Sequence, residues 1–190
     1  MKIAVIGTGN IGGTLGSKWR AAGYDVVYGG RSAGGEGPGG APIEAVSEAV
    51  RAADVVLFAV PGAVVADVAA ALGAGLAGKV VIDAANRFGQ AEFNSHAAIA
   101  TAAPDARYVR AFNTLGWENY AEPPRGASLF FVADADARAT AEELISAIGL
   151  EPAYVGDADA RGTVDALLPL WIAMVTQHGG DRKVAFAVVR

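Results

Sequence analysis

Short runs of consecutive apolar residues alternate along the chain with segments whose apolar residues recur every three or four positions. Lys2–Ile6 is a run without polar alternation, which is typical of a strand buried on both faces in a parallel sheet. Ile11, Leu15 and Trp19 then recur at helical spacing. Gly23 follows as a residue that readily ends a helix. The chain is therefore predicted to begin with a strand followed by a helix.

The same alternation continues to about residue 155. The pattern predicts further strands at 25–28, 54–60, 79–84, 107–112, 128–132 and 152–155, and further helices at 42–52, 63–72, 95–102 and 137–148. Residues 29–40 contain seven glycines and one proline, which indicates a mobile loop. Because strands that alternate with helices favour right-handed parallel crossovers, the sequence predicts an α/β fold with a doubly wound, mostly parallel sheet. Such sheets bind ligands at the carboxyl ends of their strands.

Composition narrows the class of protein. The 190 residues are 53% hydrophobic and 18% charged, carry a net charge of −5 and include no cysteine. An acidic chain without a basic stripe is a poor nucleic-acid binder, and a chain without cysteine has no disulfide, thiolate metal site or cysteine nucleophile. The first predicted strand begins at Lys2, which leaves no room for a signal peptide, and the apolar run 166–175 is about half as long as a membrane-spanning helix. We therefore expect a cytoplasmic protein without membrane partners, in which 166–175 is a buried or subunit-facing helix.

The loop after the first strand has a glycine pattern that fits a dinucleotide. Residues 7–12 read Gly-Thr-Gly-Asn-Ile-Gly between the predicted strand and the predicted helix. In this setting Gly7 permits a tight turn, Gly9 lets the backbone approach a pyrophosphate, and Gly12 lets the helix pack closely on the strand. The amides of Asn10 and Ile11 would face the anion at the helix N-terminus. The alternative is a glycine-rich turn without a ligand, in a chain that contains 25 glycines.

The end of the second predicted strand indicates which dinucleotide binds. An NAD site needs a carboxylate about 20 residues past the glycines, for the ribose 2′-hydroxyl. Here the sequence reads Gly29-Gly30-Arg31-Ser32, with no acid before Glu36. The Arg31 guanidinium matches a 2′-phosphate, and the hydroxyls of Thr8 and Ser32 could assist it, so we predict NADP(H) as the cofactor. The alternative is that Arg31 is a solvated loop cation.

Three further loops follow predicted parallel strands and should meet at the nicotinamide side of the cleft. They contain Val60-Pro61, Asn86-Arg87-Phe88, and the segment from Asn113 to Trp117. Asn86 and Asn113 can donate and accept hydrogen bonds to a carboxamide or a flavin-like ring edge. Equally, Pro61 could only end a strand, and either asparagine could only cap a turn.

The sequence also resembles a known family. The segments GTGNIGGTLG, GGRS, FAVPG, VIDAANRF and especially AFNTLGWENY look like those of the NADPH-dependent oxidoreductases of the deazaflavin coenzyme F420, and the resemblance extends through LLPLWIAM to HGGDRKVAFAVV. The cytoplasmic NADPH-binding domains of the six-transmembrane metalloreductases look like relatives. The resemblance implies a Rossmann domain over residues 1–155, with a C-terminal helical addition over 156–190 that completes the acceptor pocket. It also implies a homodimer.

The resemblance implies the reaction and the roles of individual residues. Hydride would pass directly between the nicotinamide of NADP(H) and coenzyme F420, or a flavin-like carrier, without a side chain that acts as acid or base. Thr8 and Arg31 match 2′-phosphate contacts. Asn10 and Ile11 match residues of the pyrophosphate loop, and Leu115 matches the aliphatic residue packed against the nicotinamide. We predict that Asn113, Thr114 and Leu115 orient the nicotinamide, and that Asn86, Phe88 and Trp117 shape the acceptor pocket. Val60 and Pro61 would lie beside the cofactor.

Other functions stay open at this point. The chain could reduce another small acceptor, such as free flavin or a ferric chelate, or bind NADP(H) as a sensing module without turnover. Residues 157–168 begin like a calcium loop, but Arg161 and Leu168 stand where ligands are required, so a turn leading into a helix is expected. No grouping of residues predicts a metal site, and no GxSxG motif points to a hydrolase.

Overall fold

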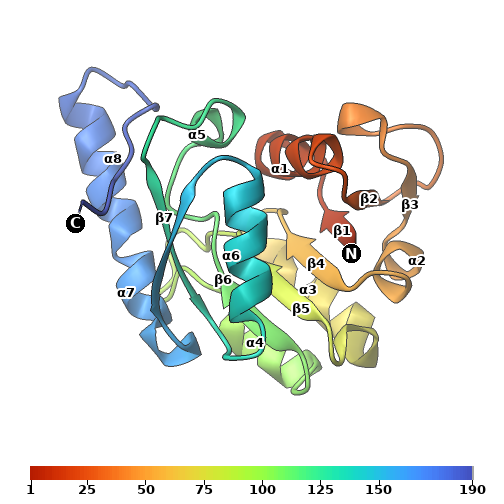
Figure 1. Cartoon of the computed structure of the whole chain (residues 1–190). Helices are drawn as coiled ribbons and strands as arrows, with labels where there is room; N and C mark the ends of the chain where they lie inside the picture. Colours follow the sequence, from red (N-terminus) through yellow and green to blue (C-terminus); the bar gives the residue numbers. More distant parts are fainter. Residues whose placement is uncertain (190) are drawn as a thin grey trace.

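The computed structural model describes residues 1–189, which fold around one sheet of eight strands (Figure 1). The strands are β1 (Lys2–Ile6), β2 (Asp25–Gly30), β3 (Ile43–Ala45), β4 (Val55–Phe58), β5 (Val80–Asp83), β6 (Arg107–Arg110), β7 (Ser128–Ala133) and β8 (Glu151–Gly156). Their spatial order is β3-β2-β1-β4-β5-β6-β7-β8. The strand order reverses at β1, whose Ile3 pairs with Val26 on one side and Val55 on the other. This is the doubly wound, Rossmann-type sheet that the alternation predicts.

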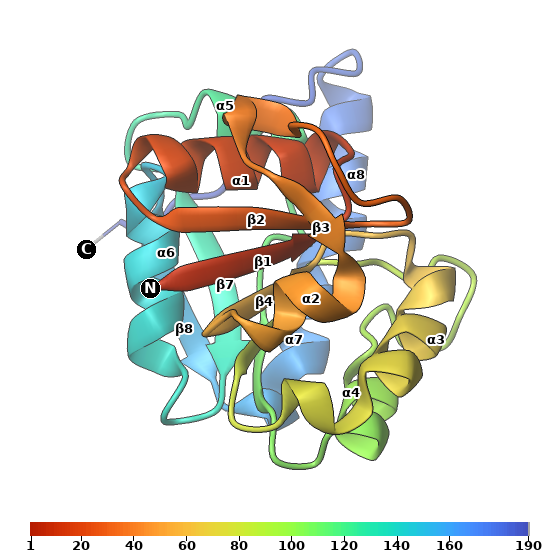
Figure 2. The same ribbon diagram turned by 90° about the vertical axis from the view of Figure 1, so that its right-hand side faces the viewer.

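Helices cover both faces of the sheet. They are α1 (Asn10–Ala21), α2 (Val46–Arg51), α3 (Gly62–Leu72), α4 (His96–Ala102), α5 (Trp117–Ala121), α6 (Arg138–Ala147), α7 (Arg161–Asp165) and α8 (Leu167–Gln177), with short 3-10 turns η1 (Pro38–Gly40), η2 (Gly73–Leu76) and η3 (Ala158–Ala160). Figure 2 shows α1 and α2 on opposite sides of β1 and β2.

Each face has its own apolar core. Buried side chains of α1, α5, α6 and α8 pack with those of one sheet face, and buried side chains of α2, α3 and α4 pack with those of the other. Trp19 is the largest fully buried side chain; its indole N–H donates to the carbonyl of Leu144 in α6 at 2.9 Å. The predicted stripe of Ile11, Leu15 and Trp19 therefore joins α1 to the sheet and to α6.

The segment after β2 differs from the prediction. Residues 42–52 do not form one helix: Ile43–Ala45 is strand β3, paired parallel to β2, and only Val46–Arg51 is helical. Gly29 and Gly30 belong to β2, and the amide of Gly34 donates to the carbonyl of Ile43 at 2.8 Å. Sheet pairing with β2 thus overrides the local helical pattern, and backbone hydrogen bonds give part of the glycine-rich loop a regular structure.

The carboxyl half of the chain adds two features that the pattern does not predict. Trp117–Ala121 forms helix α5 at the end of the expected loop, and β7 runs antiparallel to β6 while every other strand pair is parallel. Beyond β8, Asp157 accepts a hydrogen bond from the amide of Asp159, and η3 leads directly into α7. That segment is the predicted turn into a helix.

Within the described residues, none of the helices combines the length and the apolar character needed to cross a membrane. The apolar run 166–175 becomes α8, which lies at one edge of the molecule (Figure 1). Trp171 faces inward and is 5% exposed, whereas Leu170 is 48% and Ile172 43% exposed. This helix is therefore partly buried and partly open at the surface.

Candidate active site

The glycine loop joins β1 to α1 through two close backbone approaches. Gly7 has φ 112°, and a Cβ there would lie 2.5 Å from the carbonyl oxygen of Ala59. A Cβ on Gly12 would lie 2.1 Å from the carbonyl oxygen of Gly7. Both contacts are with backbone, which cannot move aside cheaply, so any side chain at either position would push α1 away from the strands.

Gly9 is different, because no protein atom occupies the space next to its Cα. It is the N-cap of α1, has φ −71°, and a Cβ there would meet no atom within 4 Å. No side chain caps the helix, so no side-chain oxygen accepts from the amides of its first turn. The space above Gly9 is thus open, positively polarised by the helix N-terminus and lined by unpaired amides, as an anionic ligand requires.

Arg31 and Ser32 lie immediately beyond the end of β2 and are exposed, as is Thr8 in the glycine loop. Within residues 1–189 the Arg31 side chain forms no hydrogen bond or ion pair with the protein. β1 and β2 are parallel neighbours, so Arg31 and Thr8 follow the carboxyl ends of adjacent strands. An unpaired guanidinium at this edge is available to a phosphate.

A cleft of about 460 Å³ opens over the carboxyl ends of β1, β4 and β5. It brings together several residues that the sequence singles out: Gly9, Asn10, Ile11, Val60, Pro61, Asn86 and Phe88. Ala84 and Ala85 complete the wall, and the ring of Phe88 is 66% exposed at the rim. The cleft therefore joins the glycine loop to the loops that follow β4 and β5.

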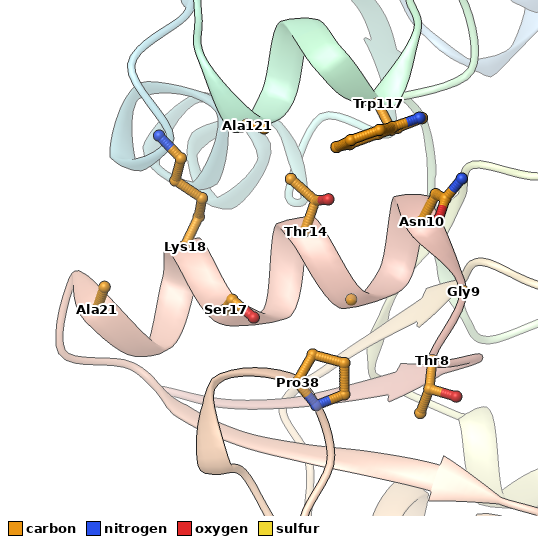
Figure 3. A pocket seen from close by; sticks show the side chains of 11 residues that line it. Thr8, Gly9, Asn10, Thr14, Ser17, Lys18, Ala21, Pro38, Trp117 and Ala121 are labelled. Carbon is orange, nitrogen blue, oxygen red and sulfur yellow. The ribbon is translucent and has the colours of Figure 1, made fainter.

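A second hollow, of about 560 Å³, is a groove along the outer flank of α1 (Figure 3). Its floor is the α1 flank that carries Asn10, Thr14, Ser17 and Lys18, and Figure 3 shows Pro38 on one side and Trp117 of α5 on the other. Trp117 thus lines the groove, whereas Asn86 and Phe88 line the cleft. The three residues expected to shape one acceptor pocket lie in two hollows, which meet at Gly9 and Asn10.

The residues expected to orient the nicotinamide are nearly covered. Asn113 is 3%, Thr114 1% and Leu115 6% exposed, and none of them lines the cleft or the groove. The Nδ2 of Asn86 donates to the backbone carbonyl of Asn113 at 2.8 Å, which ties the loop after β5 to the loop after β6. A direct contact of these three side chains with a nicotinamide stays a prediction.

Phe112 gives the loop after β6 an unusual backbone. It has φ 62°, the only non-glycine residue with positive φ among residues 1–189. Such a conformation costs about 1–3 kcal/mol and persists only where the surroundings enforce it. Here the buried ring packs edge-on against Trp19 and Tyr120, with centroid distances of 5.7 and 5.8 Å. Packing on the α1 face thus holds the turn that precedes Asn113.

Beneath the cleft wall lies a buried polar cluster that the sequence does not indicate. Arg110, fully buried, bonds to Asp83 at 3.3 Å and to Asp165 of α7 at 2.8 Å. Burial raises the pKa of Asp83, although Arg110, the amide of Ser95 and the hydroxyl of Tyr108 favour its carboxylate. Burial likewise raises the pKa of Tyr108 well above its usual value. The sequence offers no signal for this cluster, because Asp165 lies 55 residues from Arg110.

No group of three or more histidine, aspartate and glutamate side chains within residues 1–189 is arranged to hold a metal ion. His96 packs its ring edge-on against Tyr108, 4.7 Å between centroids, and burial lowers its pKa. The polar side chains that line the cleft are the amides of Asn10 and Asn86, which can donate and accept hydrogen bonds.

Comparison with known proteins adds to this geometry. Residues 2–87 match the model of the family described as NADP oxidoreductase, coenzyme F420-dependent. These residues include the glycine loop, Arg31 and the cleft wall through Asn86.

Solved structures match over a longer span. A candidate F420-dependent NADP reductase from Arthrobacter sp. FB24 is 27% identical, with a TM-score of 0.84 and coverage of 100% of both chains. A protein of unassigned function from Sinorhizobium meliloti is also 27% identical, with a TM-score of 0.71 over 87% of this chain and 89% of that one. A reductive aminase from Aspergillus terreus, solved with NADPH, is 21% identical; its TM-score of 0.72, over 94% of this chain and 62% of its own, shows a shared fold. Residues 2–87 thus resemble the coenzyme F420-dependent NADP oxidoreductase family, and the whole chain shares its fold with a candidate F420-dependent NADP reductase.

Proposed function

We propose that this protein is an NADPH-dependent oxidoreductase that transfers hydride directly between nicotinamide and a deazaflavin, coenzyme F420, or a flavin-like carrier. The observation that carries the proposal is the open space over Gly9 at the N-terminus of α1, where the protein leaves both room and unpaired amides for a pyrophosphate. Arg31 lies at the neighbouring strand end, where a 2′-phosphate would follow. The family match supports the same cofactor.

The side chains of the cleft bind and orient rather than transfer protons. When bound, the reduced nicotinamide supplies a hydride from C4, and the deazaflavin accepts it at C5 and takes a proton from solvent at N1. The chain's own contribution is to hold two rings in contact and keep water away from them, which can lower the barrier by roughly 7–11 kcal/mol in well-oriented reactions. Val60, Pro61 and the methyl groups of Ala84 and Ala85 give the cleft an apolar wall suited to this.

The acceptor would enter where the cleft and the groove meet, beside Asn10. From there its ring can reach the cleft between the rim residue Phe88 and Trp117, and the rest of the molecule can follow α1 along the groove. Lys18 lies in the groove roughly 12 Å along the helix axis from Asn10. Coenzyme F420 and flavin nucleotides combine a planar ring with an anionic tail, which suits this arrangement.

A screen of acceptors tests the reaction. NADPH and NADH are each mixed with the protein and with F420, FMN or FAD, and the absorbance of the oxidised acceptor is followed in stopped flow. We expect bleaching of F420 or a flavin with NADPH. Bleaching only of a ferric chelate would favour another acceptor, and NADPH binding without any turnover would favour a sensing module.

Replacing Arg31 tests the cofactor preference. Arg31→Ala should weaken NADPH by about tenfold or more and leave NADH nearly unchanged, because only NADPH carries the 2′-phosphate. Arg51→Ala is the matched control, since Arg51 is exposed and ends the helix that leads into the amino end of β4. Calorimetric titration with both nucleotides gives the affinities; equal losses for the two would contradict the role of Arg31.

A second copy of the chain would cover the exposed apolar side chains of α8, including Leu170 and Ile172. We expect a homodimer located in the cytoplasm, with the C-terminal residues from 156 onward completing the acceptor pocket. Light scattering coupled to gel filtration measures the mass, and Leu170→Lys should shift it toward the monomer. A monomeric mass for the unaltered chain would contradict the expectation.

A further inference from the structure

The wall of the cleft rests on a buried cluster that includes a residue from the C-terminal segment. We define the Arg110 cluster as Asp83, Asn86, Arg110, Asn113 and Asp165. Four of these side chains are at most 5% exposed, and Asn86, the fifth, lines the cleft. Asp165 belongs to α7, far along the chain from the family match that ends at residue 87.

Arg110 fixes the loop after β5 by three hydrogen bonds. It donates to the backbone carbonyls of Asp83, at 3.0 Å, and Ala85, and to the Oδ1 of Asn86 at 2.8 Å. The segment that it holds is the cleft wall itself. The five N–H donors of a guanidinium lie in one plane, so it can donate to several acceptors at once only if the orientation of that plane is fixed.

Asp165 provides that fixation. Its Oδ1 lies 2.8 Å from both the Nε and the Nη2 of Arg110, and its Oδ2 accepts from the Nδ2 of Asn94 at 2.8 Å. The guanidinium is thus oriented by a carboxylate on one edge and by the cleft wall on the other. Removing the charge of Asp165 would leave the position of Arg110, and with it the wall, less defined.

Asp165 also determines the orientation of the Asn113 side-chain amide, that is, whether its nitrogen or its oxygen faces the carboxylate. The Nδ2 of Asn113 donates to Oδ1 of Asp165 at 3.2 Å, and a carboxylate can only accept. The amide oxygen of Asn113 must therefore point away from Asp165. The Oδ1 of Asn113 is buried and has no hydrogen-bond partner in the part of the chain that the structure describes. A buried acceptor without a partner costs free energy, which the hydrogen bond from the other end of the same amide to Asp165 offsets.

We propose that Asp165 is a positioning residue for the nicotinamide end of the site, acting through Arg110 on the cleft wall and through Asn113 on the neighbouring loop. This inference rests on the proposed function. It makes the C-terminal segment part of the site, because α7 supplies the carboxylate. Buried ion pairs are on their own weak contributors to stability compared with apolar packing, so a role in fixing geometry accounts better for such a cluster at the cleft wall.

The test separates the two halves of the cofactor. Asp165→Asn keeps the size of the side chain but allows it either to donate to or to accept from Asn113. We expect the affinity for NADPH to fall about tenfold, the equivalent of one well-placed hydrogen bond, while the affinity for 2′,5′-ADP, which lacks the nicotinamide, stays within twofold. The rate of hydride transfer at saturating NADPH should fall as well, with a larger isotope effect from 4-deuterated NADPH.

Two further variants provide the controls. Asp134→Asn removes a carboxylate that accepts from the backbone amide of Tyr108 at 2.6 Å, outside the cluster. It should lower the melting temperature without changing the ratio of the NADPH and 2′,5′-ADP affinities. Asn113→Ala removes only the route through Asn113, so it should reproduce part of the loss at the nicotinamide end, and Asp165→Asn should lower the affinity for NADPH further in that background through Arg110. If Asp165→Asn does not fold, Asp165→Glu carries the test, because it keeps the charge that pairs with Arg110 and displaces the oxygen that accepts from Asn113.

The outcomes distinguish this inference from the proposed function. An unchanged affinity ratio and an unchanged hydride-transfer rate in Asp165→Asn or Asn113→Ala would overturn the inference, whichever acceptor the protein reduces. If no acceptor is reduced, the affinity ratio still decides the role of Asp165. If the unaltered protein does not bind NADPH, both proposals fail.

Discussion

The cleft over the strand ends and the groove along α1 share Gly9 and Asn10, but their walls are built differently. The cleft wall is backbone and short side chains, held from below by the fully buried Arg110. The groove is lined by half-buried side chains of three separate elements, among them Lys18 and Trp117. Rigid support suits a ring that must be placed accurately, whereas partly exposed side chains suit a tail that only needs to be attracted.

The largest effect should come from removing the support of the cleft. Arg110→Met leaves two buried carboxylates without their cation, and should lower the free energy of unfolding by about 3–5 kcal/mol. Arg138→Met removes an arginine of the exposed pair with Glu142 and should cost less than about 1 kcal/mol. Urea denaturation measures both. A loss below about 1 kcal/mol for Arg110→Met would show that the cluster does not hold the wall.

Two glycines of the shared loop should separate stability from binding. Gly12→Ala forces a Cβ onto the carbonyl of Gly7 and should cost about 1–3 kcal/mol of stability. Gly9→Ala meets only open space, so it should cost less than about 1 kcal/mol while raising the Kd for NADPH by about tenfold or more. Thermal unfolding and nucleotide titration measure the two quantities. If Gly9→Ala binds NADPH normally, the space over Gly9 is not the pyrophosphate site.

The same loop shows what a sequence can reveal. Gly7, Gly9 and Gly12 are predictable because their effects are local: each follows from the turn between one strand and one helix. The doubly wound sheet is predictable for the same reason, since it repeats a local unit. Strand β3 is not, because its pairing with β2 overrides a helical pattern that starts at Pro42.

The Arg110 cluster could not be predicted for a further reason. In the segment RYVRAF, the sequence does not distinguish Arg107 from Arg110, yet Arg107 is partly exposed and Arg110 is fully buried. The difference lies in Asp165, which the sequence presents only as part of a rejected calcium loop. Likewise the positive φ of Phe112 depends on Trp19, nearly a hundred residues earlier. Contacts between distant segments leave no periodic trace in a sequence.

Two buried tyrosines, one on each side of the sheet, allow the cleft side and the groove side of the molecule to be compared by mutation. Tyr108 donates to Asp83 under the cleft at 3.1 Å, whereas the hydroxyl of Tyr120, on the buried side of α5, has no partner within residues 1–189. At neutral pH, Tyr108→Phe should cost about 1–2 kcal/mol of stability, and Tyr120→Phe should cost nothing measurable. Equal costs in denaturant unfolding at pH 7 would contradict the difference.

Alkaline pH should affect both tyrosines in the same direction. Burial raises both phenol pKa values above the usual 10. Below pH 10 both forms of the chain keep neutral phenols; above it the unfolded chain ionises first, so stability is lost as pH rises toward the folded pKa. Each phenol then contributes up to about 1.4 kcal/mol per pH unit. The slope of unfolding free energy against pH above 10 should therefore be shallower in either Phe variant, and an unchanged slope would contradict burial of that phenol.

The smallest effect should come from the groove, where a single cation is expected to attract an anionic tail. Lys18 forms no ion pair within the described residues, so Lys18→Ala leaves the fold unstrained. It should raise KM for FMN or F420 by about two- to fivefold and leave riboflavin, which has no phosphate, unchanged, because an exposed charge contact contributes at most about 1 kcal/mol. Lys2→Ala, at the amino end of β1, is the matched control. Added salt should remove the difference between FMN and riboflavin in the unaltered protein, since screening acts on exposed charges. An equal change in KM for both flavins would mean that the tail does not follow α1, and would leave the cleft alone as the place where the acceptor is held.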